Sequence, residues 1–229
     1  MQPYFFPYIG YFQLMHAVDV FVMYDDAQYM KGGWINRNRI RSRHTATWLT
    51  FPVRKASREL AINQREYLLS DGAATHRIEQ RLQASYAGAP CRREVGPVIS
   101  GLLRFNESNV ATFNANLLEA LARQLGIGCR FLVSSQIDKP ANLKGQAKVI
   151  DLCRRIGASH YVNPVGGVEL YDAASFDAAG LRLSFLRTTT MPVTLADGQQ
   201  YLSIIDGLMH EGFAGCGSRL AEHVLQAAE

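Results

Sequence analysis

Two adjacent carboxylates, Asp25 and Asp26, are the side chains best suited to acid–base chemistry in this sequence. They follow residues 19–24, an apolar run that predicts a buried strand. Open α/β sheets bind ligands beyond the carboxyl ends of their strands, where this pair would lie. There the carboxylates, with Gln28 in the same loop, can orient an amine, accept its proton or bind Mg²⁺. The structural alternative is that they cap the following turn.

A second polar cluster follows at Trp34, Asn36, Arg37 and Asn38. A guanidinium can pair bidentately with phosphate, and the two amides can bind sugar hydroxyls. The cluster therefore suits a phosphate-bearing sugar. The alternative is a loop that braces itself with its own hydrogen bonds.

The opening segment, residues 2–11, mixes aromatic rings with polar groups and lacks the aliphatic period of a simple core. Pro3 and Pro7 predict an extended backbone in its first half. Tyrosine hydroxyls need partners when buried, so we expect the segment to line a pocket. The alternative is an aromatic core beneath a loop. The candidate binding residues are Gln2, Tyr4, Tyr8, Gly10 and Tyr11.

Two further positions are candidates on weaker signals. His76 falls in a predicted helix and can act as a general base near neutral pH, although a lone helical histidine is more often structural. Gly166 and Gly167 follow a predicted strand and can form a ligand-facing turn. Cys153 lies on an apolar helical face, which favours a core position over a nucleophile.

The basic residues are unevenly distributed. Residues 27–58 contain no Asp or Glu but eight bases, which favours a surface that attracts a phosphate-bearing ligand or an acidic protein. The alternative is a solvated basic edge. Nucleic acid is disfavoured because the region has no recognisable nucleic-acid module. We favour the solvated edge for Arg41, Arg43, Arg54, Lys55 and Arg58.

The composition is that of a globular chain: 229 residues, 48% hydrophobic, 19% charged and a net charge of +4. No apolar run reaches the roughly 18 residues of a membrane span, and no signal peptide is visible. The four cysteines form no CxxC pair, so neither a zinc site nor a disulfide framework is expected. These features favour a cytoplasmic protein.

Apolar periodicity predicts alternating strands and helices, hence an α/β fold with a mostly parallel, Rossmann-like sheet. We expect strands at 19–24, 47–53, 129–134, 159–163 and 181–186. We expect helices at 9–17, 73–87, 95–104, 108–125, 143–156, 202–209 and 218–227, with a short helix or turn at 175–179. Residues 1–72 and 127–229 would form the core domain, and residues 73–126 a helical insertion or cap.

Five segments carry a family resemblance: QPYFFPYIGYFQL, DVFVMYDDAQYMKGGWINRN, WLTFPV, IGASHYVNPVGG and LSIIDGLM. With His76 and Tyr86, they resemble the WbqC-like family of bacterial proteins over nearly the whole chain. That family is associated with O-antigen and other surface polysaccharides, which implies a role in building or decorating sugars. Members usually carry a short apolar strand before the first motif, so we expect that strand to be absent here through a late start. His210-Glu211 replaces an aromatic–Asn pair of the family.

The opening also resembles that of nucleotidyltransferase-like α/β enzymes, including amide-forming ligases. In those enzymes a His-x-Gly-His motif contacts ATP phosphates at a helix N-terminus. The corresponding residues here are Tyr8-Ile9-Gly10-Tyr11. Tyrosine donates a hydrogen bond but offers no cation near pH 7, which argues against the usual ATP chemistry.

Three functions fit these observations. The first is a transferase that places an acyl or aminoacyl group on the amine of a sugar or nucleotide-linked sugar, with a phosphopantetheine-linked donor on an acidic acyl carrier protein. The second is an ATP- and Mg²⁺-dependent nucleotidyltransferase or amide ligase. The third is a non-catalytic binding protein of a polysaccharide pathway. The carboxylate pair and the acid-free basic stretch favour the first.

Overall fold

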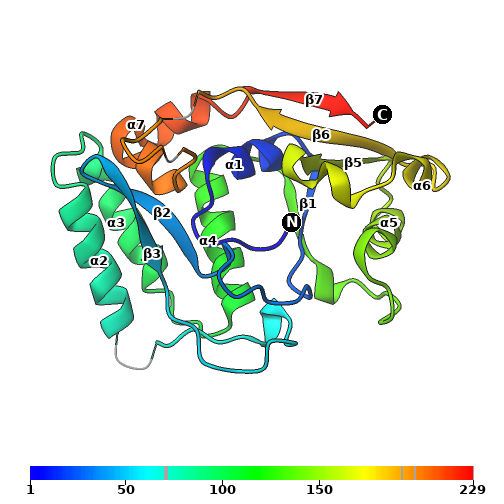
Figure 1. The fold of residues 1–229 in the computed structure, drawn as a ribbon, viewed down its shortest axis with the longest axis horizontal. Helices are drawn as coiled ribbons and strands as arrows, with labels where there is room; N and C mark the ends of the chain where they lie inside the picture. The colour runs from blue at the N-terminus through cyan, green and yellow to red at the C-terminus, as the bar shows by residue number, and fades with distance from the viewer. Residues whose placement is uncertain (70–71, 192, 199, 229) are drawn as a thin grey trace.

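The computed structural model describes residues 1–69, 72–191, 193–198 and 200–228, and it confirms the α/β class (Figure 1). Helices surround several small sheets. The α-helices are α1 (Ile9–His16), α2 (Ala73–Ser85), α3 (Arg92–Leu103), α4 (Val110–Gln124), α5 (Gly145–Arg155), α6 (Ala173–Asp177) and α7 (Ile204–Ser218). The 3-10 helices are η1 (Ile62–Gln64), η2 (Ser134–Gln136) and η3 (Val165–Leu170).

The strands are β1 (Val20–Met23), β2 (Arg37–Ser42), β3 (Thr45–Thr50), β4 (Arg130–Val133), β5 (His160–Pro164), β6 (Arg182–Thr188) and β7 (His223–Ala227). In the described residues they form three small sheets instead of the single mostly parallel sheet that we expected. β1 pairs with β4 and β5 with β6, both parallel; β2 pairs with β3 and β6 with β7, both antiparallel.

The main core gathers the opening segment, the hairpin β2–β3, helices α2 to α4 and helix α7. Phe5, Phe12 and Phe113 are completely buried in it. The ring centroids of Phe5 and Phe51 lie 6.0 Å apart, and those of Phe51 and Phe113 lie 5.5 Å apart. Aromatic residues at the start of the chain therefore hold α4 and the hairpin together, as edge-to-face pairs commonly do.

A smaller core lies beneath β5 and β6. It joins Cys153 of α5 to Phe176 of α6 and to Leu181, Leu183 and Phe185 along β6. Burial raises the pKa of the Cys153 thiol to about 11, so the thiol stays protonated near neutral pH. A core position for this cysteine is confirmed.

Residues 73–126 form the three consecutive helices α2, α3 and α4, which lie beside the hairpin in Figure 1. Their buried side chains belong to the same core as the opening segment. The proposed division into a core domain and a helical insertion stays a prediction. In the described part of the chain, no helix combines the length and the apolar character needed to cross a bilayer.

The element predictions failed at two places. Residues 218–227 were expected to be helical, but His223–Ala227 form β7, whose backbone pairs antiparallel with β6. Residues 37–42 were interpreted as a polar loop, but they form β2. Its buried positions, Asn38 and Ile40, alternate with arginines that lie on the other face. In both cases backbone pairing with another strand, and not the local composition, decided the structure.

Candidate functional site

The opening segment runs from the carboxyl end of β1 to the start of β2. Tyr24 N donates to the Met1 carbonyl at 2.7 Å. Because Tyr24 directly precedes Asp25 and Gln2 directly follows Met1, this bond brings Gln2 towards the carboxylate pair. Further along, Phe5 N donates to the Trp34 carbonyl at 3.0 Å. The segment therefore contacts Trp34 of the second polar cluster, and the residue before it is bonded to Tyr24, next to the first.

Asn38 braces this segment from beneath. Its Nδ2 donates to the carbonyls of Phe5 at 3.2 Å and Phe6 at 2.8 Å, and Ser203 Oγ also donates to Phe6 at 2.8 Å. Phe6 has φ +42°, a left-handed conformation that costs about 1–3 kcal/mol in a residue with a Cβ. Because Asn38 is buried and spends its amide on this turn, its observed contacts are structural.

Asp25 is buried and fully occupied by the protein. Its carboxylate accepts from Ser135 N at 2.9 Å, Ser135 Oγ at 2.5 Å and Asn63 Nδ2 at 3.0 Å. These bonds tie the loop after β1 to η2 and η1. Asp25 therefore has a structural role, which is closer to the capping alternative than to acid–base catalysis.

Asp26 lies in a different environment at the same strand end. Its Oδ1 accepts from Ser134 Oγ at 2.7 Å and pairs with Lys148 Nζ at 3.0 Å, and its Oδ2 pairs with Lys139 Nζ at 3.0 Å. Partial burial would raise the pKa of Asp26, but the hydrogen bonds from Ser134 and both lysines outweigh it and lower the pKa. Asp26 therefore stays ionised and is a weak base.

The two lysines differ in how many of their donors are used. Lys139 Nζ contacts Asp26 and the carbonyls of Ser134 and Ile137, which accounts for its three N–H bonds. The hydrogen-bond acceptors of Lys148 Nζ are both on Asp26: Oδ1 at 3.0 Å and the carbonyl at 3.4 Å. Within the described residues, Lys148 thus keeps one N–H for a further acceptor.

The Tyr24 ring lies beside this ammonium. Lys148 Nζ lies 4.6 Å from the ring centroid of Tyr24, a cation–π distance. Burial, with smaller contributions from Asp26 and Tyr171, raises the pKa of Tyr24 to about 12. Tyr171 OH lies 3.0 Å from Tyr161 OH. Near neutral pH these phenols are protonated and can donate hydrogen bonds.

The glycine turn after β5 reaches the same end of the molecule. Tyr161 OH donates to Asn163 Oδ1 at 3.3 Å. The Asn163 amide packs so closely on Gly167 that a Cβ there would overlap it, whereas Gly166 has open space. Gly167 therefore has a packing reason to be glycine.

We call Tyr24, Asp26, Ser134, Lys139, Lys148 and Tyr171 the carboxyl-end cluster. It combines cationic and hydroxyl donors at the carboxyl ends of the parallel strands β1 and β4, as ligand sites of open α/β sheets do. Asp26 belongs to this cluster and Asp25 directly precedes it, and the carboxylate oxygens of both already have partners. Among the described residues, no three His, Cys, Asp or Glu side chains group as a metal site.

The predicted tyrosines of the opening segment form a separate aromatic group. The Tyr4 and Tyr11 ring centroids lie 5.6 Å apart, and Tyr11 OH donates to the Gln2 carbonyl at 2.7 Å. Burial raises the pKa of Tyr4, Tyr8 and Tyr11. A Cβ on Gly10 would meet the Tyr8 ring, so the absence of a side chain there lets the ring fold over α1.

The second polar cluster bonds mainly to its own loops. Asn36 Nδ2 donates to the Phe51 carbonyl at 2.8 Å, and its Oδ1 accepts from Tyr29 OH at 2.9 Å. Arg37 donates to the Gly32 and Gly33 carbonyls. Exposed Gln28 donates to the Arg58 carbonyl at 3.0 Å.

Trp34 faces the hairpin surface, 5.6 Å from Trp48 between ring centroids. In the described chain, no hydrogen bond or ion pair joins Asp25 or Asp26 to Tyr8, Arg37 or Asn38. The structure therefore brings Gln2 towards the carboxylate pair but does not bond the pair to these other candidates.

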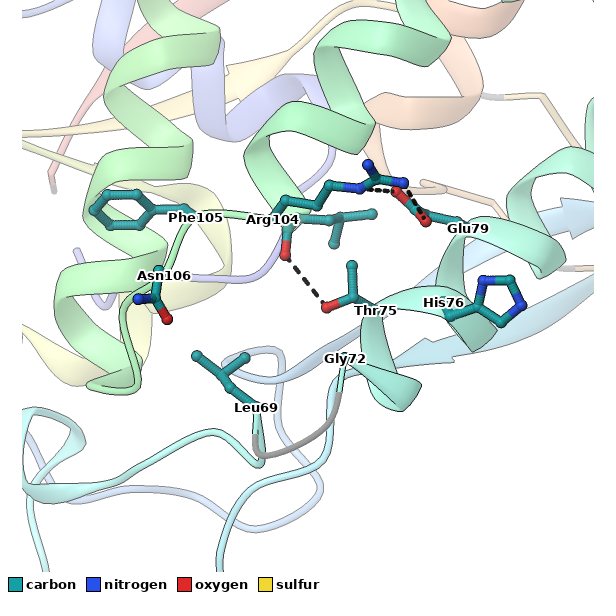
Figure 2. Close-up of a pocket in the computed structure, with 9 residues that line it drawn as sticks. Leu69, Gly72, Thr75, His76, Glu79, Arg104, Phe105 and Asn106 are labelled. Atoms are coloured by element: carbon teal, nitrogen blue, oxygen red, sulfur yellow. Dashed lines mark hydrogen bonds and ion pairs between the residues drawn. The ribbon is translucent and has the colours of Figure 1, made fainter.

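His76 is remote from the carboxylates. Helix α2 lies at the left of Figure 1, while β1 lies beyond α4. His76 is exposed at the edge of a hollow of about 360 Å³, and Figure 2 shows its ring turned away from Phe105 and Asn106. The acid in this hollow, Glu79, is paired with Arg104 at 2.9 Å, which lowers its pKa.

Sequence reasoning missed Tyr24, Lys139, Lys148 and Tyr171. Tyr24 directly precedes the carboxylate pair, so its position was a usable signal. The lysines lie more than 100 residues from Asp26, and only the parallel pairing of β1 with β4 shows that they belong together.

These observations define an α/β protein whose candidate ligand groups lie at the carboxyl ends of parallel strands. The WbqC-like protein family model matches residues 2–216, so the chain belongs to that family. It is 31% identical over 188 residues to the protein named "Uncharacterized protein Rv1507c" of Mycobacterium tuberculosis, covering 81% of this chain and 79% of the relative. No solved structure gives a significant match.

Proposed function

We propose that this WbqC-like protein transfers an acyl or aminoacyl group to the amine of a sugar or nucleotide-linked sugar in the biosynthesis of O-antigen or a related polysaccharide. The single observation that carries the proposal is the Lys148 ammonium, held beside Asp26 with one donor left over. The family's association with polysaccharides supplies the substrate class.

Lys148 would bind a phosphate of the nucleotide-linked sugar. It lies in the first turn of α5, where Lys144 at the N-cap makes no side-chain cap. The first amides of a helix and its dipole favour an anion, and a lysine in the same turn adds to that attraction. Lys139 would act as a positioning residue, because its donors are used to hold Asp26 and η2 in place.

The proposed reaction forms a C–N bond between the sugar amine and the donor carbonyl, and breaks the C–S bond of the thioester. The ammonium first gives one proton to water, the neutral amine then attacks the carbonyl, and its second proton goes to the sulfur, which leaves as the thiol. The lowered pKa of Asp26 suits it to orient an ammonium ion but makes it a poor base, so water takes the proton. Asp25 and His76 have no place in this mechanism, because one is fully bonded and the other is remote.

We also propose that the fold is related to Rossmann-like nucleotidyltransferase enzymes. The parallel pairs β1–β4 and β5–β6 and the ligand groups beyond their carboxyl ends support this relation. A substrate linked to a nucleotide would place the protein in the cytoplasm. ATP chemistry lacks a cation at Tyr8 and Tyr11, where the related enzymes have histidines.

The test is an incubation of the purified protein with a panel of acyl and aminoacyl thioesters and nucleotide-linked amino sugars, with mass spectrometry for amide products. Product should form without ATP, and Lys148→Ala should reduce it at least tenfold. Lys55→Ala, an exposed lysine elsewhere, is the matched control. A folded protein that yields no amide across the panel would overturn the proposal, and pyrophosphate release that requires ATP would favour a ligase.

A further inference from the structure

The hairpin β2–β3 presents arginines and tryptophans on its outer face. Arg39 pairs with Trp48 across the strands. The guanidinium carbon of Arg39 lies 5.0 Å from the Trp48 ring centroid and 5.3 Å from that of Trp34, and Arg37 lies 4.1 Å from Trp48. Such stacking holds guanidinium planes in fixed positions. Arg37 already donates to the Gly32 and Gly33 carbonyls, whereas the edge of Arg39 stays able to donate.

Helix α2 extends this surface. Arg81 Nη1 donates to the Trp48 carbonyl at 2.7 Å, and Arg77 lies one turn earlier on the same side of the helix. Both arginines line a groove of about 460 Å³ between β3 and α2, whose floor includes the buried side chains of Leu49 and Ile78. Among the described residues, no acidic side chain lines the groove. We call Trp34, Arg37, Arg39, Trp48, Arg77 and Arg81 the Arg–Trp face.

Acids near the hairpin lie outside this face. Asp206 pairs with Arg41, and Asp197 accepts from Ala46 N at the turn end of the hairpin. Glu79 of α2 pairs with Arg104. In the described structure, neither Arg39 nor Arg77 makes an ion pair with an acid. Within the described residues, the positive charge of Arg39 and Arg77 is therefore not balanced by an ion pair.

We propose that the Arg–Trp face docks the acidic helical surface of an acyl carrier protein, which delivers the thioester donor. This inference rests on the proposed function. Carboxylates on a partner helix would pair with the fixed guanidinium planes, and an apolar side chain would enter the groove over Leu49 and Ile78. Single-stranded nucleic acid fits less well, because arginines already stack on the indole faces that bases would need.

One edge of the face, at Trp34, is within reach of the carboxyl-end cluster, whereas Arg77 and Arg81 lie on the more distant helix α2. The opening segment joins them: Met1 is bonded to Tyr24, and Phe5 is bonded to Trp34. Four residues of extended chain span at most about 14 Å. The two hydrogen bonds add 2.7 and 3.0 Å, so the backbone at Trp34 lies close enough to Tyr24 for a long flexible prosthetic arm to bridge them.

The test is the equilibrium binding of a purified, acidic holo acyl carrier protein at low and moderate salt. The wild-type protein should bind, and added salt should weaken binding steeply. The double variant R77E/R81E should bind at least tenfold more weakly. Arg93→Glu, the same charge change at an exposed site on α3, should change binding less than twofold.

Three results would overturn the inference: no binding by the wild type, equal weakening by Arg93→Glu, or tighter binding of a single-stranded oligonucleotide than of the carrier. Circular dichroism checks that R77E/R81E folds, and Arg77→Glu alone is the milder variant if it does not. The measurement needs no turnover. Carrier binding without amide formation would therefore reject the proposed reaction and retain the docking face.

Discussion

Two polar regions flank the opening segment, and they differ in whether a hydrogen-bond donor stays available for a ligand. The first is a buried brace, made by Asp25, Asn38 and Asn114, whose polar atoms bond to loops of the main core. The second is the carboxyl-end cluster, where Asp26 is shared by Lys139 and Lys148 and a donor of Lys148 stays available. Both were equally polar in the sequence.

The difference shows that polarity alone does not mark a site. A buried amide such as that of Asn38 is needed wherever an irregular backbone leaves carbonyls without partners. A ligand site requires donors that the fold positions but does not use. The predictions below separate the two regions by their effects on stability and on binding.

The largest loss of stability should come from Asn114→Leu. Asn114 Nδ2 donates to the carbonyls of Pro3 at 2.8 Å and Ile35 at 2.7 Å, and its Oδ1 accepts from Tyr67 OH at 2.9 Å. The substitution leaves several buried groups without partners, which should cost about 3–5 kcal/mol in urea unfolding. Asn106→Leu, at an exposed position, should change stability by about 0.5 kcal/mol or less.

The next largest difference in stability is expected between alanine variants of Asp25 and Asp26. Asp25→Ala removes the acceptor of three hydrogen bonds in a buried loop and should cost about 2–3 kcal/mol. Asp26→Ala lies in a more exposed position and should cost less, while it releases both lysines. Equal losses of stability for the two variants in thermal unfolding would contradict the distinction between the structural role of Asp25 and the role of Asp26 in the carboxyl-end cluster.

Methionine variants of Lys139 and Lys148 should differ in ligand affinity and in stability. Lys139→Met should cost about 1.5–3 kcal/mol of stability, because it removes three charge-assisted bonds. Lys148→Met should cost about 1 kcal/mol, since Asp26 keeps Lys139 and Ser134. Lys148→Met should nevertheless lose more ligand affinity. The reverse order of affinities would place the ligand elsewhere.

The smallest effect is a pH dependence from Asp26. Its pKa is lower in the folded protein than in the unfolded chain, so Asp26 adds stability above the unfolded value near 4. That contribution is lost as the pH falls through the folded pKa. Denaturant titrations between pH 7 and pH 3 should show a shallower fall for Asp26→Asn than for the wild type. Parallel curves would contradict the ion pairing.

Much of the fold followed from local signals. Apolar runs and glycine stops located most elements within a few residues: Gly126 follows α4, and Gly157 follows α5. The helix expected from residue 108 has its N-cap at Asn109, whose side chain accepts from the amides of Ala111 and Thr112. β7 and β2 were missed because their pairing with β6 and β3, and not their composition, makes them strands.

Less of the site could be predicted. The position of Asp26 after a strand identified the correct corner, because strand ends are local features. The partners of Asp26 could not be found this way, since Lys139 and Lys148 reach it through tertiary packing. The sequence also could not show that Asp25 and Asn38 use their hydrogen-bonding groups within the protein, because their partners come from distant loops.

The most direct test of the central claim is calorimetric binding of nucleotide-linked amino sugars to the wild type and to Lys148→Ala. If the carboxyl-end cluster holds the phosphate, one sugar nucleotide should bind the wild type, and Lys148→Ala should weaken it tenfold or more while the protein stays folded. Equal affinity for both proteins would contradict the claim.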